Sequence, residues 1–175
     1  METLHGNLHA FKRSPRTAVR GMSMFLGVLR KGITKTTLTE AGMQVCQLLN
    51  HVLTSYHPHT YTSIVINHNT TSTPHKDTKN TGPSTITTLG DFTDGGNFLI
   101  WHDNNLENPP TEVEIRGKLH VFTGSQFLHA NSSYSGERFS IIWFTYKAAL
   151  TRQYTPDDIE KLLTLGFNLP QDPLP

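Results

Sequence analysis

Two residue types that bind metal ions lie close together in residues 74–80, whose sequence is Pro-His-Lys-Asp-Thr-Lys-Asn. His75 and Asp77 are separated by one residue, so both side chains can reach a single ion if an extended segment ends there. Such a pair is common by chance, and the alternative is a turn in which Asp77 caps a backbone amide. A third ligand must come from a distant part of the chain. His129 is the best candidate, because it follows an apolar pair, as expected where a strand ends at a site.

Arg138 and Ser140 follow His129 and alternate onto one face of a predicted strand. The other face of that strand is apolar, with Phe139 and Ile141. An arginine that faces inward on a strand needs an anionic partner, because an unpaired buried charge is strongly unfavourable. A carboxylate bound through two guanidinium nitrogens is the natural partner, so this pair is a candidate site for a dicarboxylate.

The predicted ligand set suits two kinds of metal chemistry. Two histidines and one carboxylate on one side of an ion form the facial triad of non-haem Fe(II) oxygenases, which leaves positions open for a co-substrate and O2. Zinc bound by the same ligands and a water molecule would instead suit a hydrolytic site. The Arg138-X-Ser140 element favours iron, because a zinc hydrolase does not need an anchor for a dicarboxylate there.

Short segments typical of β-strands dominate the chain after its first third and would position these residues. The predicted strands are residues 61–67, 84–89, 97–101, 111–115, 118–122 and 138–146. A helix is expected over residues 39–55, where apolar residues recur at helical spacing. A second helix is expected over 155–165, with Thr155 as its cap and Gly166 as its stop. Residues 21–32 fit either a short helix or a buried strand. The pattern predicts a mainly β fold with flanking helices, in the form of a sandwich or a barrel.

Length and composition set the broad class of protein. The 175 residues, 1–175, are expected to form one domain with a sizeable core. The single cysteine, Cys46, excludes an internal disulfide. No run approaches the ~20 apolar residues needed to cross a bilayer, and residues 21–29 lack the cleavage site of a signal peptide. We therefore expect an intracellular monomer, nuclear or cytoplasmic, with no membrane partner.

Charge is unevenly distributed along the chain, although the net charge is only +1. Residues 1–60 carry seven Lys or Arg and two acidic residues, whereas residues 61–175 carry eight Lys or Arg and twelve acidic residues. Residues 1–20 are predicted to form an irregular basic arm that could meet phosphates. The alternative is an ordinary solvated arm, which the charge alone favours.

The chain resembles the Fe(II)/2-oxoglutarate-dependent dioxygenases in the residues that bind metal and co-substrate, in the order His75-X-Asp77, His129 and Arg138-X-Ser140. The resemblance covers roughly residues 61–147 and implies a double-stranded β-helix, or jelly-roll, core. It implies that the first three residues are catalytic ligands of Fe(II), and that the arginine and the serine bind the distal carboxylate of 2-oxoglutarate. Asn67 is a candidate to orient this co-substrate, with a buried structural asparagine as the alternative.

Three further residues resemble those of the TET/JBP branch, which oxidises the methyl group of 5-methylpyrimidines in nucleic acid. Asn80 follows the metal aspartate by three residues, as in that branch, and its amide can pair with the edge of a flipped cytosine. Phe144 falls where the branch stacks an aromatic ring on the target base. Tyr146 falls where vertebrate members have a histidine that contacts the base. The alternatives are plain sheet aromatics for Phe144 and Tyr146, and a turn residue for Asn80.

This resemblance implies DNA as the partner and a 5-methylated pyrimidine as the substrate, with 5-methylcytosine as the favoured base. Residues 89–96 look more like fungal, algal and phage relatives than like animal members, so a phage-encoded protein is one alternative. O2 is the oxidant. Ascorbate is a candidate reductant by analogy with a related algal branch, although Arg138 favours 2-oxoglutarate, because a neutral lactone would not need it.

Other functions are compatible with parts of the pattern. A protein or small-molecule hydroxylase of the same fold would use the same metal and co-substrate residues. A non-catalytic jelly-roll binding module would have a degenerate site, and the complete ligand set argues against it. Iron-dependent formation of succinate would separate the enzyme from the module.

Overall fold

A large antiparallel sheet organises the computed structural model, which describes residues 11–13, 18–56 and 59–170. Within these ranges the sheet has 7 strands in the order β1-β2-β4-β12-β5-β9, and β3 pairs with β2 beside this path. Its strands are β1 (Lys12–Arg13), β2 (Val19–Leu29), β3 (Gly32–Ile33), β4 (Ser63–Ser72), β5 (Asn80–Leu89), β9 (His120–Phe122) and β12 (Phe139–Tyr146).

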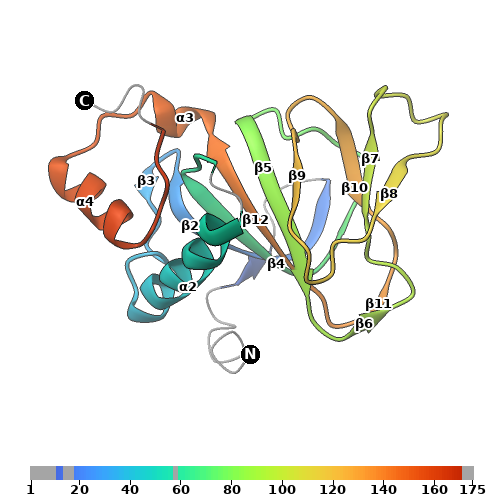
Figure 1. Ribbon diagram of the computed structural model, residues 1–175, viewed down its shortest axis with the longest axis horizontal. Coiled ribbons are helices and arrows are strands. Elements are labelled where there is room, and N and C mark those ends of the chain that lie inside the picture. The colour runs from blue at the N-terminus through green and yellow to red at the C-terminus, as the bar shows by residue number, and fades with distance from the viewer. Residues whose placement is uncertain (1–10, 14–17, 57–58, 171–175) are drawn as a thin grey trace.

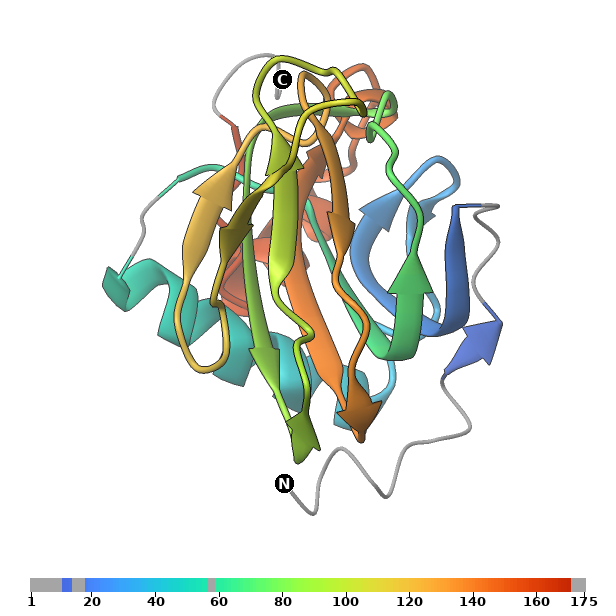
Figure 2. The ribbon, with the colours of Figure 1, turned by 90° about the vertical axis from the view of Figure 1, so that its right-hand side faces the viewer.

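A smaller antiparallel sheet of order β10-β7-β8 lies against one face of the large sheet (Figure 1; Figure 2). Its strands are β7 (Phe98–Trp101), β8 (Thr111–Val113) and β10 (Leu128–Asn131). β6 (Phe92–Thr93) and β11 (Ser135–Gly136) form a short antiparallel pair at its lower end in Figure 1. Two facing antiparallel sheets with helices to one side confirm the predicted fold class, mainly β with flanking helices.

The helices lie on the side of the large sheet away from the small one (Figure 1). They are α2 (Glu40–Tyr56), α3 (Lys147–Leu150) and α4 (Pro156–Thr164). The Thr39 side chain accepts a hydrogen bond from the Gly42 amide at the start of α2, and Thr155 accepts one from Asp158 at the start of α4. Both predicted helices are therefore present. Within the described ranges, no helix is long and apolar enough to cross a membrane.

The two faces of β12 have different surroundings, since one packs into the hydrophobic core and the other faces the small sheet. Phe139, Ile141 and Trp143 are buried in the cluster that joins the sheet to the helices. That cluster also contains Leu26, Ile64, Ile66, Val45, Cys46, Leu53 and Leu162. The alternate positions of β12 face the small sheet, because successive side chains of a strand point to opposite faces. This arrangement follows from the alternation in the sequence.

The N-terminal third differs from the sequence-based expectation in two respects. The apolar run 21–32, for which a helix was one alternative, forms most of β2 and its turn into β3, because its residues pair with β4 and bury Leu26 and Val28. The basic arm predicted over 1–20 is not irregular where it is described, since Lys12 and Arg13 pair with β2. Residues 1–10 and 14–17 of that arm lie outside the described residues.

Gly27 in β2 offers a test of the packing beneath the sheet. Its φ is +79°, and a Cβ atom there would lie 2.4 Å from the carbonyl oxygen of Thr62 and 2.7 Å from the ring of Phe167. Gly27→Ala should lower the free energy of unfolding by about 2 kcal/mol or more, because an unfavourable φ and a clash with backbone act together. Urea denaturation measures this change.

Gly82→Ala is the matched control. Gly82 has a φ of +68° but no neighbouring atom within 4 Å of the Cβ position, so only the backbone term remains. Gly82→Ala should therefore lower the free energy of unfolding by about 1 kcal/mol. Equal losses in the two variants would show that the contacts around Gly27 do not constrain the fold.

Candidate metal centre and its cavity

A cavity of about 1020 Å³ opens between the large and the small sheet. Every residue that the sequence predicts for the site lines it, namely Asn67, His75, Asp77, Asn80, His129, Arg138, Ser140, Phe144 and Tyr146. They come from β4, β5, β10, β12, the loop between β4 and β5 and, for Arg138, the residue just before β12. The fold therefore brings the predicted metal, co-substrate and substrate residues to one space.

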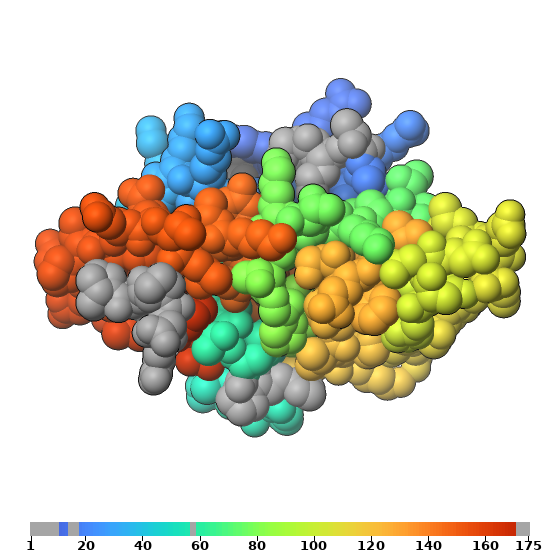
Figure 3. All heavy atoms as spheres, turned by 90° about the horizontal axis from the view of Figure 1, so that it is seen from above, coloured from blue at the N-terminus to red at the C-terminus, as the bar shows by residue number. Residues whose placement is uncertain are grey.

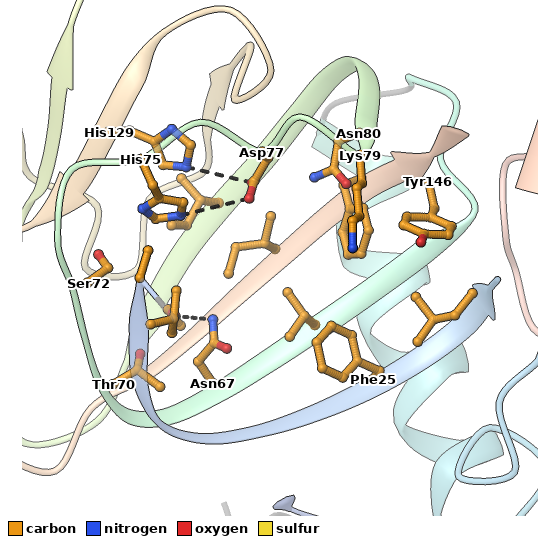
Figure 4. Close-up of a pocket in the computed structure, with 18 of the residues that line it drawn as sticks. Phe25, Asn67, Thr70, Ser72, His75, Asp77, Lys79, Asn80, His129 and Tyr146 are labelled. Carbon is orange, nitrogen blue, oxygen red and sulfur yellow. Dashed lines mark hydrogen bonds and ion pairs between the residues drawn. The ribbon is translucent and has the colours of Figure 1, made fainter. Parts of the chain in front are cut away.

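The three predicted metal ligands converge on one wall of this cavity (Figure 4). Nε2 of His75 lies 3.8 Å from Oδ1 of Asp77, and Nε2 of His129 lies 3.6 Å from Oδ2 of Asp77. One ligand atom from each residue lies within 4.8 Å of the others. Two atoms bound to one ion at about 2.1 Å can be at most about 4.2 Å apart, so small side-chain movements would close this set around an ion.

Backbone hydrogen bonds hold the ligands together. The amide of His75 donates to the carbonyl of His129 at 3.1 Å, and the amide of His129 donates back to the carbonyl of His75 at 3.0 Å. The amide of Asp77 donates to the carbonyl of Gly124 at 2.8 Å. The ligands are thus fixed by the chain and not only by their side chains.

Each histidine also has a second contact that sets which ring nitrogen carries the proton. Nδ1 of His75 lies 2.7 Å from the carbonyl oxygen of Thr73, and Nδ1 of His129 lies 3.0 Å from that of Phe127. A carbonyl can only accept, so both Nδ1 atoms carry hydrogen in these contacts. Nε2 is then the ring nitrogen of each histidine that faces Asp77, and two imidazole nitrogens with one carboxylate form a donor set suited to a divalent transition metal.

Gly124 leaves room for the Asp77 carboxylate and was not predicted from the sequence. A Cβ atom at this position would lie 3.2 Å from Oδ2 of Asp77 and 3.3 Å from the ring of His129. The rings of Phe98 and Phe122 pack beside His129, with centroids 5.7 and 5.2 Å from its ring. Both rings also line the cavity, so the surroundings of His129 are apolar and closely packed.

Arg138 lies in the same cavity wall and is only 2% exposed. Its Nε donates to the carbonyl of Gly96 at 3.0 Å, and its guanidinium lies 5.7 Å from the ring of Phe92 and 5.2 Å from that of Tyr134. Burial lowers the pKa of Arg138 to about 10. No carboxylate of the described residues pairs with it. A buried cation without a carboxylate partner is unfavourable, so the sequence-based prediction that Arg138 binds an anion remains a prediction that this geometry permits.

Asn67 links Ser140 to β2. Oγ of Ser23 donates to Oδ1 of Asn67 at 2.8 Å, and Nδ2 of Asn67 donates to Oγ of Ser140 at 3.1 Å. Ser140 therefore accepts from Asn67 and keeps its own proton to donate. Asn67 is thus a buried structural asparagine that orients Ser140, and its predicted role toward a co-substrate stays a prediction.

Asn80, Phe144 and Tyr146 line the cavity away from Arg138. Every second residue of β12 lines the cavity, and successive lining residues are about 6.6 Å apart along the strand. Figure 4 shows Asn80 and Tyr146 on the opposite side of Asp77 from the two histidines. Asn80 begins β5 opposite Tyr146, and its backbone amide donates to the carbonyl of Asp77 at 2.9 Å, which closes a turn over residues 77–80.

The architecture matches that of solved oxygenase structures. NgTET1 in complex with 5mC DNA is 19% identical, with a TM-score of 0.60 over 93% of this chain and 73% of that chain. An oxidoreductase of the 2OG-Fe(II) oxygenase family from Burkholderia pseudomallei is 15% identical, with a TM-score of 0.56 over 83% of this chain and 77% of that one. A prolyl hydroxylase from Trichoplax adhaerens, in complex with a hypoxia inducible factor oxygen degradation domain peptide fragment, is 12% identical, with a TM-score of 0.55 over 87% and 79%.

This chain has the double-stranded β-helix fold of the Fe(II)/2-oxoglutarate oxygenases. At these identities the similarity establishes the fold, and the jelly-roll core predicted from the sequence is confirmed. No protein-family model and no curated protein sequence matches the chain.

Within this oxygenase fold, sequence reasoning missed polar residues of β4 and β10 that line the cavity. They include Thr70, Ser72 and Asn131. Oγ of Ser72 donates to Oδ1 of Asn131 at 2.8 Å and accepts from the Asn131 amide at 3.0 Å, which joins the two sheets. The predicted strand stopped at residue 67. The alternation of Thr70 and Ser72 was the signal that could have extended it.

Metal binding at this wall can be tested directly. Calorimetric titration with Mn(II) under anaerobic conditions should show one binding site, and Asp77→Asn should remove it, because a neutral amide is a poor ligand beside two neutral imidazoles. Gly124→Ala should weaken binding by about 10- to 100-fold, as found when the support of a metal ligand is disturbed.

Asp94→Asn is the control, since Asp94 is exposed and does not line the cavity. Its affinity for Mn(II) should equal that of the unmodified protein. An unchanged affinity in Asp77→Asn would place the metal elsewhere.

Proposed function

We propose that this chain is an Fe(II)- and 2-oxoglutarate-dependent dioxygenase that oxidises the methyl group of a 5-methylated pyrimidine in DNA, with 5-methylcytosine as the favoured base. The observation that carries the proposal is one cavity that holds a His-Asp-His cluster, a buried arginine and several lysines and arginines. The fold supports it, because NgTET1, a protein of the same fold, has been solved in complex with 5mC DNA.

His75, Asp77 and His129 would hold the iron, and their donor set fits it. Bound Fe(II) together with 2-oxoglutarate supplies the activation of O2 that oxidises a C–H bond of the substrate, with succinate as a product. The chain's own part is to orient each imidazole ring through its Nδ1 contact, so that Nε2 faces the metal position. Phe98 and Phe122 pack against the His129 ring and limit its movement.

Arg138 and Ser140 would bind the distal carboxylate of 2-oxoglutarate. The guanidinium is held by the carbonyl of Gly96 and by the flanking ring of Tyr134, so its remaining N–H groups are oriented before the anion binds. Ser140 donates its proton to the carboxylate while it accepts from Asn67. A rigid, buried cation with an adjacent hydroxyl binds a carboxylate more strongly than an exposed one, because water competes less there.

Asn80, Phe144 and Tyr146 would form the base-binding part of the cavity. An extruded base is read by hydrogen bonds to its edge and by stacking on aromatic side chains. Asn80 supplies a side-chain amide beside Asp77 (Figure 4), and Phe144 supplies a ring on the same strand as Ser140. The base would then meet the metal wall with its substituent facing the ligands.

A protein or small-molecule hydroxylase is the second candidate, favoured by the prolyl hydroxylase that shares the fold. The charges of the cavity favour a nucleic acid. Six cationic residues line it, which are Arg30, Lys31, Lys35, Lys76, Lys79 and Arg138. Asp77 is the one carboxylate among the described lining residues, and it is a proposed metal ligand. A lining of this kind suits a polyanion better than a neutral peptide.

Mass spectrometry of nucleosides tests the substrate. DNA that contains 5-methylcytosine should yield an oxidised base on incubation with the protein, Fe(II), 2-oxoglutarate and O2, and Asp77→Ala should abolish this product and succinate alike. Phe144→Ala should lower base oxidation about 5-fold or more, because stacking contributes about 1–3 kcal/mol for each base. Succinate formed without DNA should stay at the unmodified level in that variant.

Asn105→Ala is the control, because Asn105 is exposed and lies outside the cavity. Unchanged pools of 5-methylcytosine and 5-methyluracil, together with succinate formation, would remove the DNA substrate and leave the oxygenase. Parallel reactions with and without ascorbate test its predicted role as a reductant.

Steady-state kinetics tests the co-substrate site. Arg138→Gln should raise the KM for 2-oxoglutarate about 30-fold or more, since removing one partner of a buried charge pair costs about 2 kcal/mol or more. Arg116→Gln is the matched control, because the Arg116 guanidinium stacks 3.8 Å above the Phe92 ring but lies outside the cavity. Its KM should change by less than about 2-fold. Equal KM values for the two variants would place the carboxylate elsewhere.

A further inference from the structure

Two groups of cationic side chains stand on opposite sides of the cavity, and neither is explained by metal or co-substrate binding. One group belongs to the turn between β2 and β3 and the segment after β3, and the other to the loop between β4 and β5. The first comprises Arg30, Lys31 and Lys35, and the second comprises Lys76 and Lys79. All five side chains are exposed and line the cavity, so they mark its mouth.

The turn between β2 and β3 presents its charges on a fixed scaffold. Leu29 pairs with Gly32, so Arg30 and Lys31 form the two-residue tip of a tight hairpin. Oγ1 of Thr34 donates to the carbonyl of Phe25 at 3.0 Å, which holds the chain after the hairpin against β2. The tip can therefore offer two positive charges at a defined place.

The loop between β4 and β5 is fixed in the same way. The amide of Lys147 donates to the carbonyl of Lys79 at 2.9 Å, and Nζ of Lys147 donates to the carbonyl of Thr78 at 3.0 Å. The Asp77 amide is bound to the carbonyl of Gly124. Lys76 and Lys79 thus project from a backbone anchored on both sides of the metal wall.

The two groups share one face of the molecule. In the large sheet β2 and β5 lie on either side of β4 and β12, so the hairpin after β2 and the loop before β5 lie at the two flanks of the strands that line the cavity. In Figure 4, Lys79 lies above the cavity and Phe25 of β2 lies below it. In Figure 3, the light-blue hairpin and the green loop are both visible from above, with the orange segment after β12 beside them. A ligand seated in the cavity would have one group on each side.

These charges are not neutralised within the described residues. Among the described residues, one lysine, Lys118, forms an ion pair with a carboxylate, that of Glu114, and no arginine does so. Neither Lys118 nor Glu114 lines the cavity. The whole chain has a net charge of only +1. Five exposed cations around one opening therefore concentrate positive potential there, which attracts a polyanion and orients it.

We infer that the hairpin group and the loop group bind the phosphates on either side of the nucleotide whose base enters the cavity. This inference rests on the proposed nucleic-acid substrate. A strand whose base is extruded keeps its flanking phosphates at the mouth of the pocket. Lysine and arginine bind such phosphates without reading sequence, so the two groups would set the position and direction of the strand. The predicted basic arm over 1–20 is not needed for this contact.

Salt dependence of DNA binding tests the inference. A fluorescein-labelled 12-mer with one central 5-methylcytosine would be titrated with the protein loaded with Mn(II) and 2-oxoglutarate, at several salt concentrations, and its Kd followed by anisotropy. Each lost phosphate contact should reduce the slope of log K against log salt by about 0.7 for single strands and about 0.9 for duplex. Arg30→Gln/Lys31→Gln and Lys76→Gln/Lys79→Gln should therefore each reduce it by about 1.4 to 1.8.

Lys118→Gln/Lys161→Gln is the matched control, because both lysines are exposed and neither lines the cavity. Its slope should equal that of the unmodified protein. The affinity for Mn(II) and the melting temperature should be unchanged in all three double variants, which separates lost phosphate contacts from a disturbed metal wall. An unchanged slope in either mouth variant, or an equal reduction in the control, would overturn the inference.

The outcomes also separate this inference from the proposed function. Reduced slopes without oxidation of the methylated base would support the phosphate sites and count against the reaction. Oxidation with unchanged slopes would leave the reaction in place and overturn the phosphate sites. Binding of an acidic 12-residue peptide with the same affinity and the same response to the variants would also overturn them, in favour of a protein partner.

Discussion

The candidate site depends on one antiparallel backbone pair, the two hydrogen bonds between His75 and His129. His75 lies in the loop between β4 and β5, whereas His129 lies in β10 of the small sheet. The pair joins the two sheets at the point where both imidazoles meet the Asp77 carboxylate. Because the pairing belongs to the backbone, folding itself brings the ligands together. A metal would then bind a site that is already close to its final geometry, which is the condition for tight and specific coordination.

β12 provides the second constraint, because one strand separates core from cavity along its whole length. It lies between β4 and β5, so neighbours on both sides fix its register. A slip of one residue would turn Arg138 and Ser140 toward the helices and Phe139 into the cavity. The anion site and the aromatic residue Phe144 therefore keep a constant separation. That separation suits a reaction in which a co-substrate and a substrate must approach one ion from different directions.

The parts of the site that could be predicted from the sequence are those that local periodicity encodes. The two faces of β12, the spacing of His75 and Asp77 and the caps of α2 and α4 all follow from neighbouring residues. The parts that could not be predicted depend on pairing between distant segments. The apolar run before β3 stays ambiguous until its partner β4 is known. Gly124 and the Gly96 carbonyl contact site residues only after the sheets have packed. The roles of the residues that line the cavity remain predictions, since a shared fold does not test them.

The buried and the exposed positive charges of the cavity suit two different kinds of anion. Arg138 is buried, and among the described residues its guanidinium makes one hydrogen bond, to Gly96. Burying such a charge without a carboxylate partner destabilises a fold, and binding of an anion would offset that cost. The cations at the mouth are exposed and hydrated, so they cost the fold little and act over a longer range. This difference in depth fits the proposed roles, in which Arg138 binds a small dicarboxylate inside the cavity and the exposed cations bind the phosphates of a polyanion at its mouth.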